Sequence, residues 1–306
     1  MRLFALVMFC SPALVSGQFQ PYFEHGRGIA PAYEGFEQNA DGSYTMYFGY
    51  MNENWEEELY VPIGANNAFS PGPSDRGQPT RFLPRRNRMV FGVEVPVDFG
   101  DQELVWTLIT REGVTQKAYG SLRKDYVLEP ITVQSESGTV AGGRENGADV
   151  QSNVPPRINL VGERIRTARV GQPVILEAVV EDDGQPKSRR YRVAFEEEDS
   201  PRERLDKALR PPIRGTVDRV VGLYFGWHIY RGDGIASFTP AQGKTWEDTR
   251  AFQNSPWSPY WEPPMLPDDN RWTAEVVFHQ PGAYVLRGRA DDGGLTADIE
   301  VVVNVE

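Results

Sequence analysis

The chain has 306 residues, of which 32 are Lys or Arg and 43 are Asp or Glu, so its formal net charge is −11. This acidic balance argues against nucleic acid and anionic membranes as partners, because both are negatively charged themselves. A length of about 300 residues is enough for two ordinary domains, each with its own hydrophobic core. Frequent glycine and proline with little helical periodicity predict an all-β protein built of short strands.

Residues 1–17 are typical of a cleavable secretory signal peptide. Arg2 supplies a positive charge, residues 3–15 are almost entirely apolar, and small residues precede Gln18. The apolar run is shorter than the roughly 20 residues that a membrane-spanning helix needs. We therefore expect a secreted or periplasmic chain with no membrane contact after cleavage. Because Cys10 is the only cysteine, the mature chain would have no disulfide and no cysteine metal site.

An N-terminal β-sandwich is predicted for residues 18–133. Several segments there alternate apolar and polar residues or are rich in β-branched and aromatic residues, as half-buried strands are. These candidate strands are 43–50, 58–61, 89–95, 103–110, 116–122 and 126–133. Five or six strands in a segment of about 115 residues favour a small sandwich.

Residues 64–87 form a long connection that is rich in proline, glycine, asparagine and arginine. It is longer than a hairpin requires, which is a property of functional loops and of loosely ordered ones. Arg81, Arg85 and Arg86 make it locally basic in an acidic protein. Two interpretations remain open: these arginines bind a ligand, or the segment is a solvated loop that packs across the sandwich.

Residues 134–153 have the serine-rich, glycine-rich and polar composition of a linker, and a second domain is expected over residues 154–306. A strand within the stretch 170–184 should bury Val174, Leu176, Ala178 and Val180 on one face, because these residues alternate with others along it. Further strands are predicted at 157–160, 220–230, 272–279, 283–290 and 295–305.

Two phrases of the second domain resemble bacterial immunoglobulin-like modules of the polycystic-kidney-disease-repeat and related types. They are Val-Gly-Gln-Pro-Val at 170–174 and Pro-Gly-Ala-Tyr-Val-Leu-Arg at 281–287, which precedes an Ala-Asp-Asp-Gly turn. The resemblance covers about 155–184 and 271–306 and implies an immunoglobulin-like β-sandwich acting as a spacer or binding appendage of an exported protein. An insertion of about 185–270 departs from the pattern and weakens the simple spacer role.

The insertion contains a predicted helix and an aromatic loop. Ser200 and Glu203 form a capping box with proline at the first helical position, which predicts a short helix over 201–209. Farther on, a proline-rich stretch carries aromatic residues that suit stacking on sugars or contact with a protein; they include Trp246, Trp257, Tyr260 and Trp261. The alternative is that these rings cover the core of the sandwich.

Two acidic turns are candidates for a shared calcium site. One contains Glu181, Asp182 and Asp183, and the other contains Asp291 and Asp292. Calcium takes six to eight oxygen ligands, and an immunoglobulin-like topology could place both turns at one end of the sandwich. The alternative is that Asp-Asp-Gly is ordinary turn chemistry. No other cofactor is indicated.

No catalytic motif is recognisable. The three histidines, His25, His228 and His279, are far apart in the sequence, and His228 is expected to pack in a core strand beside Trp227. Neither a His-Glu-x-x-His nor a Gly-x-Ser-x-Gly motif is present. The sequence therefore predicts an exported non-catalytic binding or structural module with an unknown protein or glycan partner. The alternative is a carbohydrate-binding or carbohydrate-active protein that uses the aromatic loop.

Overall fold

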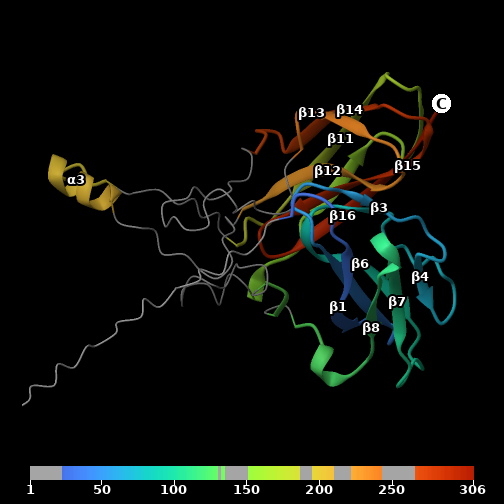
Figure 1. Cartoon of the computed structure of the whole chain (residues 1–306). Coiled ribbons are helices and arrows are strands. Elements are labelled where there is room, and N and C mark those ends of the chain that lie inside the picture. The colour runs from blue at the N-terminus through green and yellow to red at the C-terminus, as the bar shows by residue number, and fades with distance from the viewer. Residues whose placement is uncertain (1–22, 130–131, 135–150, 187–194, 210–221, 243–265) are drawn as a thin grey trace, which may run out of the picture.

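A computed structural model of the chain describes residues 23–129, 132–134, 151–186, 195–209, 222–242 and 266–306. Within these ranges the protein is all-β apart from one short α-helix and isolated helical turns, and its strands form two β-sandwiches that pack against each other (Figure 1). The all-β, two-sandwich fold class predicted from the sequence is confirmed.

The first sandwich is made of eight strands of the described N-terminal part. Its two three-stranded sheets have the orders β1-β2-β6 and β4-β7-β8, and β3 pairs with β5 beside them. The strands are β1 (Ile29–Gln38), β2 (Tyr44–Asn52), β3 (Leu59–Tyr60), β4 (Asn67–Ser70), β5 (Arg81–Phe82), β6 (Arg85–Val95), β7 (Leu104–Ile109) and β8 (Thr115–Gly120). The two sheets enclose a core of aromatic rings, in which Phe48, Phe69, Phe91 and Trp106 lie with ring centroids 5.1 to 6.2 Å apart.

The connection 64–87 is a packed part of this sandwich. It contains β4 and β5, and buried amide side chains satisfy its backbone where strand pairing does not. Asn67 donates to the carbonyls of Val61 and Pro79 and accepts from Nε1 of Trp106 at 3.0 Å. This segment is therefore buried in spite of its polar composition, because a buried amide side chain can hydrogen-bond backbone groups that no neighbouring strand pairs.

The second sandwich consists of two four-stranded sheets, with orders β10-β16-β15-β12 and β13-β14-β11-β9. Its strands are β9 (Arg157–Val161), β10 (Ile165–Ala168), β11 (Pro173–Glu181), β12 (Tyr224–Arg231), β13 (Ala236–Thr239), β14 (Arg271–Phe278), β15 (Gly282–Asp291) and β16 (Thr296–Val305). All pairings are antiparallel except that of β10 with β16. Leu176, Ala178 and Val180 of β11 are buried, as their alternation predicted, whereas Val174 is only partly buried.

Some local expectations were wrong. Residues 126–133 were predicted as a strand, but Lys124–Tyr126 is a 3-10 turn, 132–134 are helical, and Val127 makes only an isolated bridge to Phe36. By contrast, the capped helix is confirmed as α3 (Pro201–Ala208), with the reciprocal hydrogen bonds of a capping box between Ser200 and Glu203.

No helix in the described ranges is long and apolar enough to cross a membrane. The predicted signal peptide, most of the predicted linker, and the aromatic residues Trp246, Trp257, Tyr260 and Trp261 lie outside the described residues.

Candidate functional site

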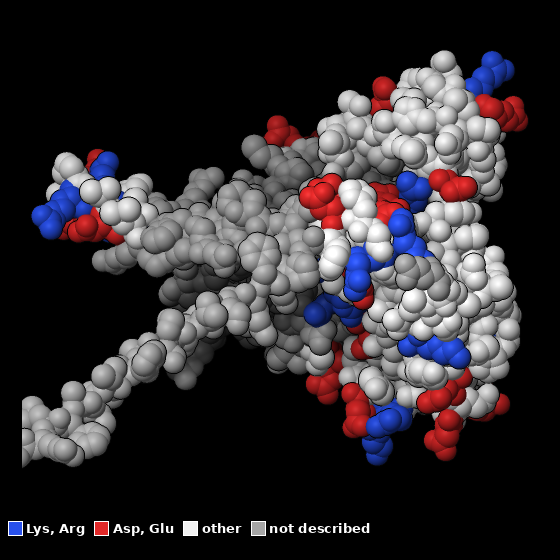
Figure 2. All heavy atoms as spheres, viewed as in Figure 1, with Lys and Arg blue, Asp and Glu red and all other residues white. Residues whose placement is uncertain are grey.

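Several charged side chains lie where the two sandwiches meet. The outer face of sheet β10-β16-β15-β12 packs against β5 and β6 of the first sandwich (Figure 1). On β12, Phe225, Trp227 and Ile229 enter the second core, so Tyr230 points the opposite way and joins the first core. Figure 2 shows basic and acidic side chains close together on the visible surface where the two sandwiches join.

Two arginines of β15 reach across the junction to a bulge in β6. Residues between Asn87 and Phe91 are not paired with β2, and Met89 has a φ of +47°, in the left-handed region. Arg287 donates to the Val90 carbonyl, and Arg289 donates to the Met89 carbonyl at 3.2 Å. A β-bulge leaves backbone groups without ladder partners, and the arginines supply the missing donors.

Both arginines are also held by carboxylates of β16. Arg287 pairs with Glu300 and Asp298, and Arg289 makes a two-pronged contact with Asp298 at 2.7 Å for each bond. The planar guanidinium suits this arrangement because it can bridge a carboxylate and a carbonyl in fixed geometry. Each arginine thus links a carboxylate of its own sandwich to the backbone of the other.

A second group of contacts joins β12 to the segment before β5. Tyr230 Oη donates to the Gly77 carbonyl at 2.6 Å, and the backbone N–H of Thr80 donates to the Tyr230 carbonyl at 3.2 Å. Arg231 forms an ion pair with Asp75 at 2.7 Å, and this hydrogen bonding lowers the pKa of Asp75. The two sandwiches are therefore joined by backbone and side-chain hydrogen bonds as well as by ion pairs.

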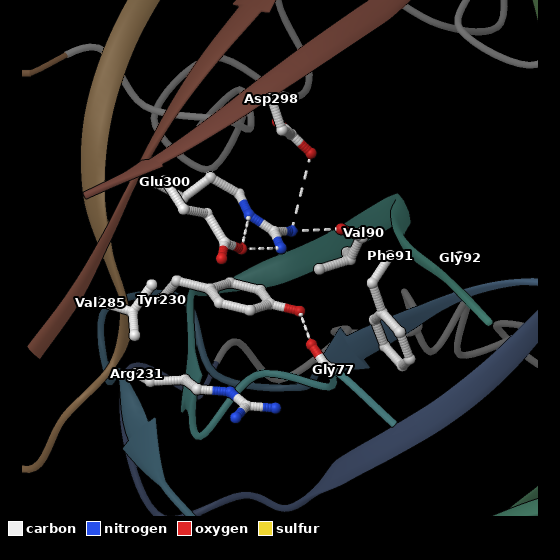
Figure 3. Close-up of a pocket in the computed structure, with 10 residues that line it drawn as sticks. Gly77, Val90, Phe91, Gly92, Tyr230, Arg231, Val285, Asp298 and Glu300 are labelled. Atoms are coloured by element: carbon white, nitrogen blue, oxygen red, sulfur yellow. Dashed lines mark hydrogen bonds and ion pairs between the residues drawn. The ribbon is translucent and has the colours of Figure 1, made fainter. Parts of the chain in front are cut away.

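A cavity of about 370 Å³ lies at this junction, as Figure 3 shows. Its lining combines backbone of the first sandwich with charged side chains of the second; it comprises Gly77, Val90, Phe91, Gly92, Tyr230, Arg231, Val285, Arg287, Asp298 and Glu300. Arg287 is already held by Glu300, Asp298 and the Val90 carbonyl, all three of which Figure 3 labels, and Arg231 pairs with Asp75 outside the lining.

His228 lies on β12 at the junction, where cations surround it. Burial lowers its pKa to about 3, and the neighbouring cations Arg289 and Arg287 act in the same direction. His228 alternates with Trp227 along β12, so it faces the arginines of the junction and not the core that contains Trp227. His228 thus packs in a strand next to Trp227 as expected, and period-two alternation places it on the junction side of that strand.

The three arginines predicted as a basic ligand site are each engaged within the chain. Arg81 pairs with Glu58 at 2.8 Å and also donates to the Asp233 carbonyl of the second sandwich. Arg86 pairs with Glu34 at 2.7 Å.

The guanidinium of Arg85 lies 4.2 Å from the ring centroid of Trp55. The contacts given above for Arg81, Arg85 and Arg86 all lie within the chain and hold its segments together. Ligand binding by these arginines stays a prediction.

The two acidic turns lie at the same end of the second sandwich. β11 and β15 both end there, because β14 runs antiparallel to β11 and leads directly into β15. Val154 N–H donates to Asp183 at 3.1 Å, and the side chain of Asn153 hydrogen-bonds Asp292. The dipeptide Asn153–Val154 therefore touches both turns.

The five predicted calcium ligands do not form one cluster. Among the described residues, no group of three or more His, Cys, Asp or Glu is arranged to hold a metal ion. Glu181 is exposed on β11, opposite Arg157 of β9. Asp183 accepts the N–H groups of Val154 and Gln185, and Asp291 accepts from Gly293 N–H and from Tyr224 Oη at 3.1 Å.

Comparison with known proteins gives matches of structure only. No protein-family model matches the sequence, and no curated protein matches it. The solved structures that match include domains 1–5 of Sidekick-1, with 8% identity and a TM-score of 0.22, over 90% of this chain and 38% of that one. Others are domains 4 and 5 of the S-layer protein SbsC, with 10% identity, a TM-score of 0.23, and coverage of 91% and 98%, and the D00-D0 domain of intimin, with 9%, 0.23, and 90% and 98%.

The two four-stranded sheets of the second sandwich have the all-β architecture that the resemblance to immunoglobulin-like modules implies. This chain spans little more than a third of the Sidekick-1 structure, and no ligand or partner is transferred from any of them.

Sequence reasoning missed the junction residues Tyr230, Arg287, Arg289, Asp298 and Glu300 as a group. One signal was available. In strands that otherwise read as buried, Arg287 and Arg289 alternate on β15 and Asp298 and Glu300 alternate on β16, so one face of that sheet carries a charged row. Such a row on a central strand indicates a face that packs against another charged or polar surface.

Proposed function

We propose that the protein is an exported, non-catalytic binding or structural module in which the two β-sandwiches act as one unit. The all-β architecture of two packed sandwiches is the coarse basis for this proposal. Export is expected from the character of residues 1–17, which predicts a mature N-terminus at Gln18.

The observation that carries the proposal is the internal pairing of the junction. Arg287 is 7% exposed, and its donors are directed at Glu300 and at the Val90 carbonyl. A charge that is already paired and hydrogen-bonded is costly to redirect toward a substrate, because its old partners would be left unsatisfied. The charged cavity is thus better suited to fixing the angle between the two sandwiches than to catalysing a reaction.

The test uses the mature chain 18–306 and a panel of insoluble cell-envelope polymers and plant and fungal polysaccharides. Retention on the polymer and release of reducing ends are both measured. We expect retention without release on at least one polymer, or chemical cross-linking to a defined envelope protein when no polymer retains the chain. Release of reducing ends by the purified protein would overturn the non-catalytic assignment, and the absence of both retention and cross-linking would overturn the binding role.

The carbohydrate alternative is decided by the same assay. Retention on a polysaccharide that is lost in Trp261→Ala, and kept in Tyr119→Ala, would assign glycan binding to the aromatic loop. Tyr119 is a matched control because it is an exposed aromatic residue on β8 of the first sandwich.

A further inference from the structure

Unpaired oxygen atoms gather at the end of the second sandwich where the acidic turns lie. Among the described residues, nine buried side-chain nitrogen or oxygen atoms have no hydrogen-bond partner, and four of the nine are at this end. The four are Asn153 Oδ1, Asp182 Oδ1, Gln185 Oε1 and Asp292 Oδ2. All four are acceptors, so none of them can satisfy another.

Their positions along the chain bring them to one place. Asp182 and Gln185 belong to the turn that follows β11, and Asp292 belongs to the turn that follows β15. Asn153 and Val154 hydrogen-bond Asp292 and Asp183, respectively, so a single dipeptide spans the interval between the two turns.

In the described part of the chain, the carboxylates of Asp292 and Asp182 at this end have neutral hydrogen-bond donors as their contacts and no cation among them. Asp292 is 1% exposed, and burial raises its pKa to about 7. The groups that oppose this rise are the N–H groups of Leu295 and Gly294 and the side chain of Asn153, all of them neutral. Burial also raises the pKa of Asp182, and its neighbour Asp183 adds to the rise. Asp182 is only half-buried, whereas the buried carboxylate of Asp292 is of the kind that a cation stabilises.

We propose that Asp182, Asp292, Asn153 and Gln185 bind one calcium ion between the two acidic turns. Two carboxylates balance the charge of a divalent cation, and two amide oxygens add the neutral ligands that calcium accepts readily. Backbone carbonyls and water would complete six to eight ligands. The set differs from the predicted one, because Glu181, Asp183 and Asp291 have other roles whereas Asn153 and Gln185 enter it.

Calcium at this place would hold the segment that precedes β9 against the two acidic turns of the second sandwich. Nδ2 of Asn153 donates to Gln134 at 3.1 Å, and Gln134 is fully buried although it lies in the segment that leaves the first sandwich. The ion would therefore strengthen the contact between Gln134 and Asn153, which lie at the two ends of the connection between the sandwiches. This inference stands independently of the proposed function.

The test is calcium titration of the mature chain 18–306, followed by thermal unfolding and by isothermal calorimetry. Extracellular calcium modules bind with Kd values of about 10⁻⁴ to 10⁻³ M, so the titration extends to 10 mM, with magnesium in parallel. We expect one site per chain and a rise in Tm on the order of 5 °C at calcium well above Kd, reversed by chelator. Magnesium should give a smaller rise, because it gives up its water ligands reluctantly.

Three variants locate the site. Asp182→Asn and Gln185→Leu should each weaken calcium binding at least tenfold, and Asp292→Asn should abolish it. Glu181→Gln is the matched control, since it changes an exposed carboxylate of the same turn and should leave the calcium response unchanged. If Asp292→Asn does not fold, the calcium titrations of the unaltered chain, of Asp182→Asn and of Gln185→Leu still test the proposal.

The proposal fails if the unaltered chain shows neither heat of binding nor a change in Tm up to 10 mM calcium. It also fails if Asp182→Asn and Gln185→Leu bind calcium as well as Glu181→Gln does.

Discussion

The guanidinium carbon of Arg287 lies 3.4 Å from the ring centroid of Tyr230. Arg287 belongs to the second sandwich, whereas the ring of Tyr230 packs in the core of the first. Cation–π contacts gain strength when both partners are removed from water. Tyr230 is 2% exposed and Arg287 is 7% exposed, which places this contact among the desolvated ones. The pair couples the two cores more directly than an exposed ion pair would.

We expect Arg287→Ala to lower the free energy of unfolding by about 2–3 kcal/mol. Removing one partner of a fully buried ion pair costs about 3–5 kcal/mol, and the loss is smaller here because Glu300 reaches solvent. Arg287→Lys should lose about half as much, because an ammonium group cannot reach Glu300 and the Val90 carbonyl in the same fork geometry. Urea unfolding measures both, and a loss below about 0.5 kcal/mol for Arg287→Ala would contradict this account.

Replacing Asn67 tests whether buried amides hold the connection 64–87 in place. Asn67→Ala should destabilise the protein by about 3 kcal/mol, because it leaves two carbonyls and the Trp106 N–H unsatisfied in the core. Asn66→Ala is the control: Asn66 is exposed, and the change should stay within about 0.5 kcal/mol. Equal effects of the two substitutions in denaturant unfolding would rule out the buried network as the cause.

Stability should fall in mild acid because of His228. Its pKa is about 3 in the fold, against an ordinary value of 6.5, so the unfolded chain binds one more proton between these values. Stability is therefore complete above pH 6.5 and decreases as pH falls toward 3, by roughly 1 kcal/mol at pH 5.5. The groups that set this pKa besides burial are Arg289, Arg287 and Asp298.

His228→Gln should flatten the stability profile between pH 7 and 5, measured as the urea midpoint at each pH. Asp75 contributes separately, since its lowered pKa means that its share of stability is lost only as pH falls below about 4. Parallel profiles for the two proteins between pH 7 and 5 would show that His228 does not titrate in this way.

Gly288 tests the packing of the second core. A Cβ at this position would lie 2.5 Å from Cζ of Phe225 and 3.0 Å from the Trp227 ring. Gly288→Ala should therefore cost about 1–3 kcal/mol through overpacking. Adding Phe225→Leu should recover part of the loss in the same unfolding experiment, and a double variant no more stable than additivity predicts would exclude this clash.

Period-two alternation was a dependable guide to the core strands. It located β2, β7, β11, β14, β15 and β16 to within a few residues, because each of these strands buries one face. Met89, the first residue of the predicted strand 89–95, is only partly buried whereas Val90 is buried, because residues 88–90 of β6 lie opposite Gly49 alone and interrupt the alternation. A bulge depends on what lies opposite it, and that contact comes from β15, about 200 residues later in the chain.

The candidate sites could be predicted only in part. The acidic turns were identifiable as Asp-Asp-Gly sequences, but the unpaired oxygens of Asn153 and Gln185 depend on which neighbours the fold supplies. Local basicity suggested a ligand site at Arg81, Arg85 and Arg86, whereas their partners Glu58, Trp55 and Glu34 come from separate segments. Composition records that charges are present and does not record which of them are paired.

The bulge in β6 also affects how this protein avoids sticking to copies of itself. β6 is at the edge of its sheet, and an edge strand with free carbonyls can recruit a strand from another chain and begin aggregation. Arg287 and Arg289 occupy the carbonyls of Val90 and Met89, and the left-handed turn at Met89 breaks the straight run that an incoming strand would need. A variant that weakened the contact between the two sandwiches would therefore expose the unpaired carbonyls of β6, and we expect it to self-associate in concentrated solution.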